Sequence, residues 1–121
     1  MSILKMPTSI YGLTEPGWQN QEIPPHTQEA IENYLIRGYE PGGFVTAVLC
    51  NDLFSATGKA DHVNRANLWC IVTWIANNAP SASFGDYERM RNWLDDRDGC
   101  RTAFAETITK KAMWETLKDE Q

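Results

Sequence analysis

The sequence has no long apolar run and no surplus of positive charge. None of its apolar stretches approaches the roughly 18 residues that a membrane-spanning helix needs. Its 11 Lys and Arg residues stand against 16 Asp and Glu residues, for a formal net charge of −5. Proteins that bind the nucleic-acid backbone by charge need a cationic face. We therefore expect no membrane insertion, and the charge disfavours direct DNA binding.

Histidine and cysteine, which hold most transition-metal sites, are few and widely spaced. The two histidines are His26 and His62, and the three cysteines are Cys50, Cys70 and Cys100. There is no C-x-x-C pair and no closely spaced pair of histidines, so the sequence predicts no metal site, no redox motif and no cofactor. The odd number of cysteines, together with a start that lacks a secretory leader, predicts reduced thiols and a cytoplasmic protein.

Catalytic motifs are also lacking. Gly42-Gly43 has none of the other residues of a phosphate-binding loop and is better explained as a turn. Cys50 could be paired with His62 as a nucleophile and base, but Cys50 follows an apolar segment that should raise the pKa of its thiol. Residues 94–99 resemble a calcium loop but lack its acidic first and twelfth ligands. We predict that the protein is not an enzyme. A small hydrolase that uses Cys50 and His62, or two carboxylates brought together by folding, is an alternative.

What the sequence does contain is enough apolar residues for one all-α domain. The chain has 121 residues, of which 42% are hydrophobic, and this length suits a single core. Apolar residues recur at helical spacing in five segments that proline, glycine or loop-like sequence separates. The expected helices are 27–37, capped by Thr27, then 44–51, 65–78, 86–96 and 101–118, capped by Asp98. Residues 53–60 are expected to form a loop, which ends where Asp61 or Asn64 caps the next helix.

The segment 65–78 is the most apolar part of the sequence. Apolar side chains cover most of its helical circumference, which predicts a central, buried helix. Its β-branched residues leave a buried strand as the alternative. Trp69 and Trp74 in this segment, and Trp93 further on, are expected to lie in the core.

Residues 1–25 have a different composition from the rest of the chain. Six prolines and glycines interrupt every periodic pattern there, so the sequence predicts an extended arm over 1–25 and a helical domain over 26–121. The arm also contains apolar residues that would favour packing on the folded domain or on a partner, and a partly ordered terminus is the alternative. These residues are Ile3, Leu4, Ile10, Tyr11, Leu13 and Trp18.

Two features stand out as candidate partner-binding sites. Asp95, Asp96 and Asp98 form a local acidic cluster that would suit a cationic partner surface, although a solvated corner and a helix cap explain them equally well. Trp18 and Trp114 do not fit the expected core, and aromatic residues outside a core are enriched at partner contacts. Packing of the arm against the last helix is the alternative for these two tryptophans.

The central part of the sequence resembles a group of small proteins encoded by phages and prophages. The resemblance lies in residues 23–27 (Ile-Pro-Pro-His-Thr), 41–44 (Pro-Gly-Gly-Phe), 47–53 (Ala-Val-Leu-Cys-Asn-Asp-Leu) and 58–61 (Gly-Lys-Ala-Asp). A weaker likeness continues to residue 94. The group has no settled biochemical activity, so the resemblance implies a phage or prophage accessory protein in a bacterial cytosol and does not imply a reaction.

The leading hypothesis from the sequence is a non-catalytic protein that binds a host protein or a protein–nucleic acid complex. An inhibitor of host defence, comparable in role to an anti-CRISPR, would be one form of it. The first rival is a nucleic-acid-associated regulatory or replication accessory protein, because residues 27–51 could form a helix-turn-helix. The second helix of that motif would carry no lysine or arginine, which weakens the rival. The sequence gives no indication of the oligomeric state.

Overall fold

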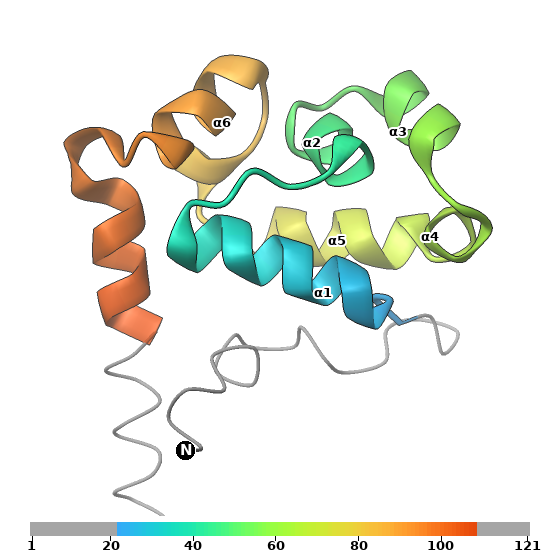
Figure 1. The fold of residues 1–121 in the computed structure, drawn as a ribbon, viewed down its shortest axis with the longest axis horizontal. Coiled ribbons are helices and arrows are strands. Elements are labelled where there is room, and N and C mark those ends of the chain that lie inside the picture. The colour runs from blue at the N-terminus through green and yellow to red at the C-terminus, as the bar shows by residue number, and fades with distance from the viewer. Residues whose placement is uncertain (1–21, 109–121) are drawn as a thin grey trace, which may run out of the picture.

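A computed structural model describes residues 22–108, and over this range the fold is all-helical, as expected (Figure 1). The predicted arm before Glu22, the end of the last predicted helix, Trp18 and Trp114 lie outside the described residues. The helices are α1 (Pro25–Glu32), α2 (Gly43–Leu49), α3 (Leu53–Lys59), α4 (His62–Ala66), α5 (Leu68–Asn78) and α6 (Tyr87–Leu94). A π-helical turn, Asn33–Arg37, extends α1, two 3-10 turns cover Ser81–Ser83 and Arg97–Gly99, and residues 100–108 are helical.

The helices surround one apolar core. Figure 1 shows α1 and α5 crossing the middle of the molecule, with α2 and α3 on one side, α4 at one end, and α6 with residues 100–108 at the other end. Tyr34, in the π-helical turn, is fully buried, and its hydroxyl donates a hydrogen bond of 2.6 Å to the carbonyl oxygen of Ser83. The core also contains Ile23, Ile31, Leu35, Val45, Leu49, Ile71, Ile75, Met90 and Trp93.

Helix α1 begins earlier than the sequence predicted. Its first residue is Pro25, which has no N–H to leave unpaired at a helix start and whose ring fixes a helical φ. Thr27 is therefore inside the helix, and the prediction that it caps α1 is wrong. The Thr27 hydroxyl is buried and donates a 2.5 Å hydrogen bond to Oδ1 of Asn64, which ties α1 to α4.

Residues 53–59 form a helix, α3, and the predicted loop is wrong. The Asp52 side chain caps this helix, with Oδ1 accepting a hydrogen bond from the N–H of Ser55 at 3.1 Å. The helix packs on α2 and buries Ala56. Serine, threonine and glycine have modest helix propensity, and the cap and the packing outweigh it.

The predicted 65–78 segment is helical and not a strand, but it is part of two helices that join at Asn67. Of the two predicted caps, Asp61 and Asn64, Asp61 caps α4, since its Oδ1 accepts the N–H of Asn64 at 2.7 Å. The longer helix α5 buries Cys70, Ile71, Trp74 and Ile75 on a single face. Trp69 lies on the opposite face and is 64% exposed, so its expected place in the core is wrong.

The turn after α6 is held by a different aspartate from the one predicted. Asp96, not Asp98, accepts hydrogen bonds from the backbone N–H of Thr102, at 3.0 Å, and from the Thr102 hydroxyl. These bonds hold the pKa of the Asp96 carboxyl below its ordinary value. Asp98 has a left-handed backbone, with a φ of 57°, which aspartate tolerates better than most residues.

Glu32 is a buried carboxyl whose protonation should change stability. It is 2% exposed, its Oε1 has no hydrogen-bond partner, and its Oε2 is 3.5 Å from Nη1 of Arg37. Burial raises the pKa of Glu32, and Arg37 opposes that effect only in part. The folded chain therefore holds this proton more tightly than the unfolded chain, so the Glu32 contribution to stability falls as the pH rises above the ordinary glutamate value of about 4.3.

We expect Glu32→Gln to stabilise the protein slightly at pH 7, with a smaller gain at pH 4. Arg37 keeps a partner in this variant, since its Nη1 also donates to Oδ1 of Asn33 at 2.8 Å. Urea midpoints at the two pH values measure the effect, and Glu106→Gln, a change at an exposed glutamate, is the control. A urea midpoint at pH 7 that is higher for the wild-type protein than for Glu32→Gln would contradict this account.

Candidate interaction surface

Large apolar side chains are exposed on three consecutive helices. Seven large hydrophobic side chains are exposed in the part of the chain that the structure describes, and five of them belong to α3, α4 or α5. We call these five the α3–α5 apolar set. They are Leu53, 63% exposed, Phe54, 91%, Val63, 40%, Trp69, 64%, and Val72, 42%.

Local structure explains why these side chains face solvent. Leu53 and Phe54 directly follow the cap residue Asp52, which fixes the start of α3, while the helix turns Ala56 inward. Trp69 and Val72 are three residues apart on α5 and therefore share one face, opposite the buried one. The fold thus holds all five on helices instead of on loops, so each side chain starts from a fixed backbone position.

Covering such side chains with a partner would be favourable. Burying a side chain of the size of Phe or Leu is worth about 1.5–3 kcal/mol, and concentrations of exposed apolar residues commonly mark interaction sites. Aromatic residues supply many of the anchors that dominate the energy of protein interfaces. Phe54 and Trp69 are the two aromatic members of the α3–α5 apolar set, so they are its strongest candidate anchors.

A polar network joins α1 to α4 next to Val63. His26 Nε2 lies 3.4 Å from Oδ2 of Asp61 and 3.3 Å from Nδ2 of Asn64. The N–H of Asn64 is the main cause of the lowered pKa of the Asp61 carboxyl, and the charge of His26 adds to it. Within residues 22–108, no group of three or more His, Cys, Asp and Glu side chains could hold a metal ion. The network is best understood as a support for the start of α4.

Cys50 has the environment of a structural thiol. Its Sγ lies 3.8 Å from Sδ of Met90, a core residue. Burial raises the pKa of the Cys50 thiol, and the negative charges of Asp52 and Asp86 raise it further. Reactive cysteines have the opposite surroundings, which lower the thiol pKa. This environment does not favour the alternative in which Cys50 is a nucleophile.

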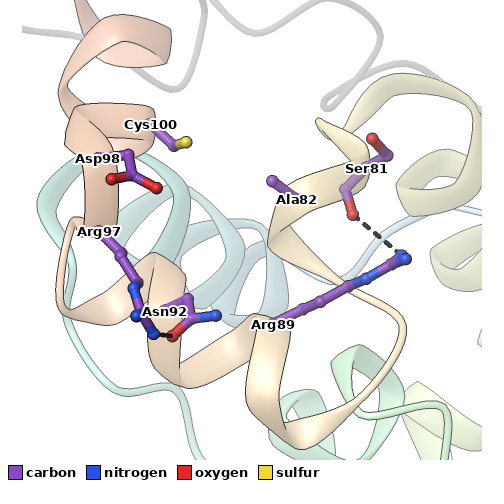
Figure 2. Close-up of a pocket in the computed structure, with 7 residues that line it drawn as sticks. All are labelled: Ser81, Ala82, Arg89, Asn92, Arg97, Asp98 and Cys100. Carbon is purple, nitrogen blue, oxygen red and sulfur yellow. Dashed lines mark hydrogen bonds between the residues drawn. The ribbon is translucent and has the colours of Figure 1, made fainter.

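A small cavity of about 360 Å³ lies between α6, the Ser81–Ser83 turn and residues 97–100 (Figure 2). Arg89 Nη1 reaches the carbonyl oxygens of Ser81 and Phe84, each at 3.4 Å, and Arg97 Nη1 donates to Oδ1 of Asn92 at 3.3 Å. Figure 2 shows the Arg89 side chain extending toward Ser81 and the Arg97 side chain toward Asn92. The two cations therefore do not converge on one ligand position. The lining consists of Ser81, Ala82, Arg89, Asn92, Arg97, Asp98 and Cys100.

The three aspartates predicted to bind a partner have separate surroundings. Oδ1 of Asp95 is 3.9 Å from Nη2 of Arg91. Asp96 accepts the hydrogen bond from the backbone N–H of Thr102. Asp98 lines the cavity together with Arg97. Of the three, only Asp98 has neither an ion pair nor a helix-capping bond within the described range. The structure thus interleaves this acidic cluster with arginine, and its use by a partner remains a prediction.

Sequence reasoning did not identify the α3–α5 apolar set. Phe54 lay in a predicted loop, and Trp69 was assigned to the core because its helix is apolar nearly all round. Two polar residues, Thr73 and Asn77, are spaced by four on the partly exposed side of α5, and this spacing was the available signal for an outward face.

Among the described residues, no helix has the length and apolar character needed to cross a bilayer.

Comparison with known proteins adds no assignment. No protein-family model, curated protein or solved structure matches this chain.

Proposed function

We propose that this chain is a non-catalytic, phage- or prophage-encoded protein that binds a host protein through the α3–α5 apolar set. The observation that carries the proposal is the exposure of Phe54, 91%, and Trp69, 64%, on helices that turn other residues, such as Ala56 and Ile71, into the core. The resemblance to small phage proteins supports the origin. An inhibitor of host defence, which acts by covering a working surface of its target, is the biological role that this origin and this surface would suit.

A protein partner fits the surface better than a nucleic acid does. The side chains in the α3–α5 apolar set are uncharged and bulky, and they suit apolar pockets in a folded partner. The cationic residues of α3 to α5 are Lys59 and Arg65, and one guanidinium N–H of Arg65 already donates to the carbonyl oxygen of Ala60 at 3.1 Å. Backbone binding to nucleic acid needs several phosphate contacts from lysine or arginine.

Capture from a lysate of the bacterial host tests this proposal. The immobilised full chain is expected to retain a host protein in an amount that nuclease treatment of the lysate does not change. Retention that nuclease abolishes would support the nucleic-acid alternative instead. A capture with no enriched protein would contradict the proposed function.

The variant Cys50→Ala separates binding from catalysis. Because the thiol donates a weak hydrogen bond of 3.8 Å to Sδ of Met90, we expect a stability loss of about 1 kcal/mol and the same capture of the host protein. Thermal unfolding and quantitative mass spectrometry of the captured fraction measure the two effects. A folded Cys50→Ala protein that keeps its partner but loses all cellular activity would favour the hydrolase alternative.

A further inference from the structure

The turn between α6 and the helix that begins at Cys100 has an unusual backbone. Asp96, Asp98 and Gly99 all have a positive φ, of 54°, 57° and 71°. Two of the three carry side chains, for which a left-handed backbone is unfavourable, although aspartate tolerates it better than most residues. Such conformations persist where other contacts hold them, and they concentrate in segments that switch between two states. The turn therefore has the backbone of a hinge.

Polar side chains fasten the helix that follows this turn. Asp96 accepts hydrogen bonds from the backbone N–H of Thr102, at 3.0 Å, and from the Thr102 hydroxyl. The Arg101 guanidinium donates to the carbonyl oxygen of Trp93, in α6, at 3.2 Å. It also lies over Gly38, where an added Cβ atom would be 2.5 Å from Cζ of Arg101. The helix is thus held in place by directional contacts at its first residues.

The apolar contacts of this helix are few. Among residues 100–108, the side chains that reach the core are Ile108, which is 9% exposed, and Phe104, which is partly buried and packs edge-on against Trp93. Helix α5, by contrast, buries four residues. Figure 1 shows the helix of residues 100–108 at the edge of the molecule. Elements with few buried apolar side chains open at a lower free energy than the core does.

We propose that the helix that begins at Cys100 is a hinged cover, which opens as a unit about residues 95–99 while the other helices stay folded. The bonds between Asp96 and Thr102 are the latch of this cover. Opening uncovers the Trp93 ring, and it moves the turn that forms one wall of the cavity in Figure 2. The opening needs no partner, so it does not depend on the proposed function.

Native-state hydrogen exchange of the full chain, followed by NMR, tests the opening. The amides of residues 104–108 are expected to share one protection factor, at least about tenfold lower than those of Ile71 and Ile75 in α5. Low concentrations of urea should leave exchange in residues 104–108 nearly unchanged, because opening the cover exposes little surface. Equal protection in the two helices would overturn the proposal. Protection that falls steadily from residue 104 to residue 108 would also overturn it, since that pattern indicates fraying of the helix end.

The variant Ile71→Val tests whether the cover opens separately from the core. Ile71 is fully buried in α5, which stays folded whether the cover is open or closed. The variant is expected to speed exchange at Ile75 by about threefold or more, because this amide exchanges through unfolding of the core. Exchange in residues 104–108 should stay within about twofold of wild type. The same acceleration in both helices would overturn a separate opening.

Two aspartate variants test the latch. Asp96→Ala and Asp98→Ala each place alanine at a left-handed position of the same turn. Asp96 bonds to Thr102, while Asp98 has no helix-capping bond within residues 22–108. Asp96→Ala is therefore expected to speed exchange in residues 104–108 by about fivefold or more beyond the effect of Asp98→Ala. Equal acceleration by the two variants would overturn the role of Asp96 as the latch.

Discussion

Replacing Trp93 by alanine is expected to lower the free energy of unfolding by about 3–5 kcal/mol. Trp93 is 2% exposed and joins α6 to two other parts of the chain. Its ring packs edge-on against Phe104, with ring centroids 5.9 Å apart, and its centroid lies 6.5 Å from that of Tyr34. Its indole N–H also donates to the carbonyl oxygen of Tyr34 at 3.3 Å. The substitution leaves a large cavity and removes the hydrogen bond to Tyr34, and both effects destabilise the fold.

Urea unfolding followed by circular dichroism measures this loss, and Tyr87→Ala is the matched control. Tyr87 lies on the same helix, α6, but is 61% exposed, so its removal should change stability by no more than about 0.5 kcal/mol. Similar losses for Trp93→Ala and Tyr87→Ala would show that the core around α6 is not packed as described.

Phe54→Ala and Trp69→Ala are each expected to weaken binding of the captured host protein by about tenfold or more. A buried aromatic anchor at a protein interface is commonly worth 2 kcal/mol or more, and 1.4 kcal/mol corresponds to a factor of ten in affinity. Both side chains project from the folded domain, so the variants should fold with nearly unchanged stability. Titration of each purified variant against the partner identified by capture gives the dissociation constants.

The controls for these two variants are Tyr39→Ala and Tyr87→Ala. The two tyrosines are 59% and 61% exposed, close to the 64% of Trp69, but they lie outside the α3–α5 apolar set. Their removal should leave the affinity within about twofold of wild type, which is the scatter expected of residues outside an interface. Equal weakening by all four substitutions would place the contact elsewhere or make it non-specific.

The helical character of the chain could be predicted from its sequence, because apolar periodicity and breaker residues are local signals. The cap of α4 could be narrowed to Asp61 or Asn64 for the same reason, and the structure selects Asp61. Helix α3 could not be predicted, because its segment contains three residues with weak helix propensity. The Asp52 side chain and the packing of Ala56 on α2 stabilise the helix, and neither effect is visible in propensity.

The candidate site was harder to predict than the fold, because it depends on which side of each helix is covered. Helix α5 is apolar on most of its circumference, and only tertiary packing decides that Ile71 is buried while Trp69 is exposed. Phe54 could not be placed, because its segment was not expected to be helical. The aspartates near residue 96 were identified as a cluster, but their individual partners, such as Thr102, depend on a left-handed turn that the sequence does not specify.

Parallel capture from one host lysate with three full-length baits tests the central claim most directly. The baits are the wild-type chain, the double variant Phe54→Ala/Trp69→Ala and the control double variant Tyr39→Ala/Tyr87→Ala, each first shown to be folded by circular dichroism. We predict one host protein that the wild-type and control baits enrich equally and that the Phe54→Ala/Trp69→Ala bait retains at about a tenth of that amount or less. Equal enrichment by all three baits would contradict a partner that binds through the α3–α5 apolar set.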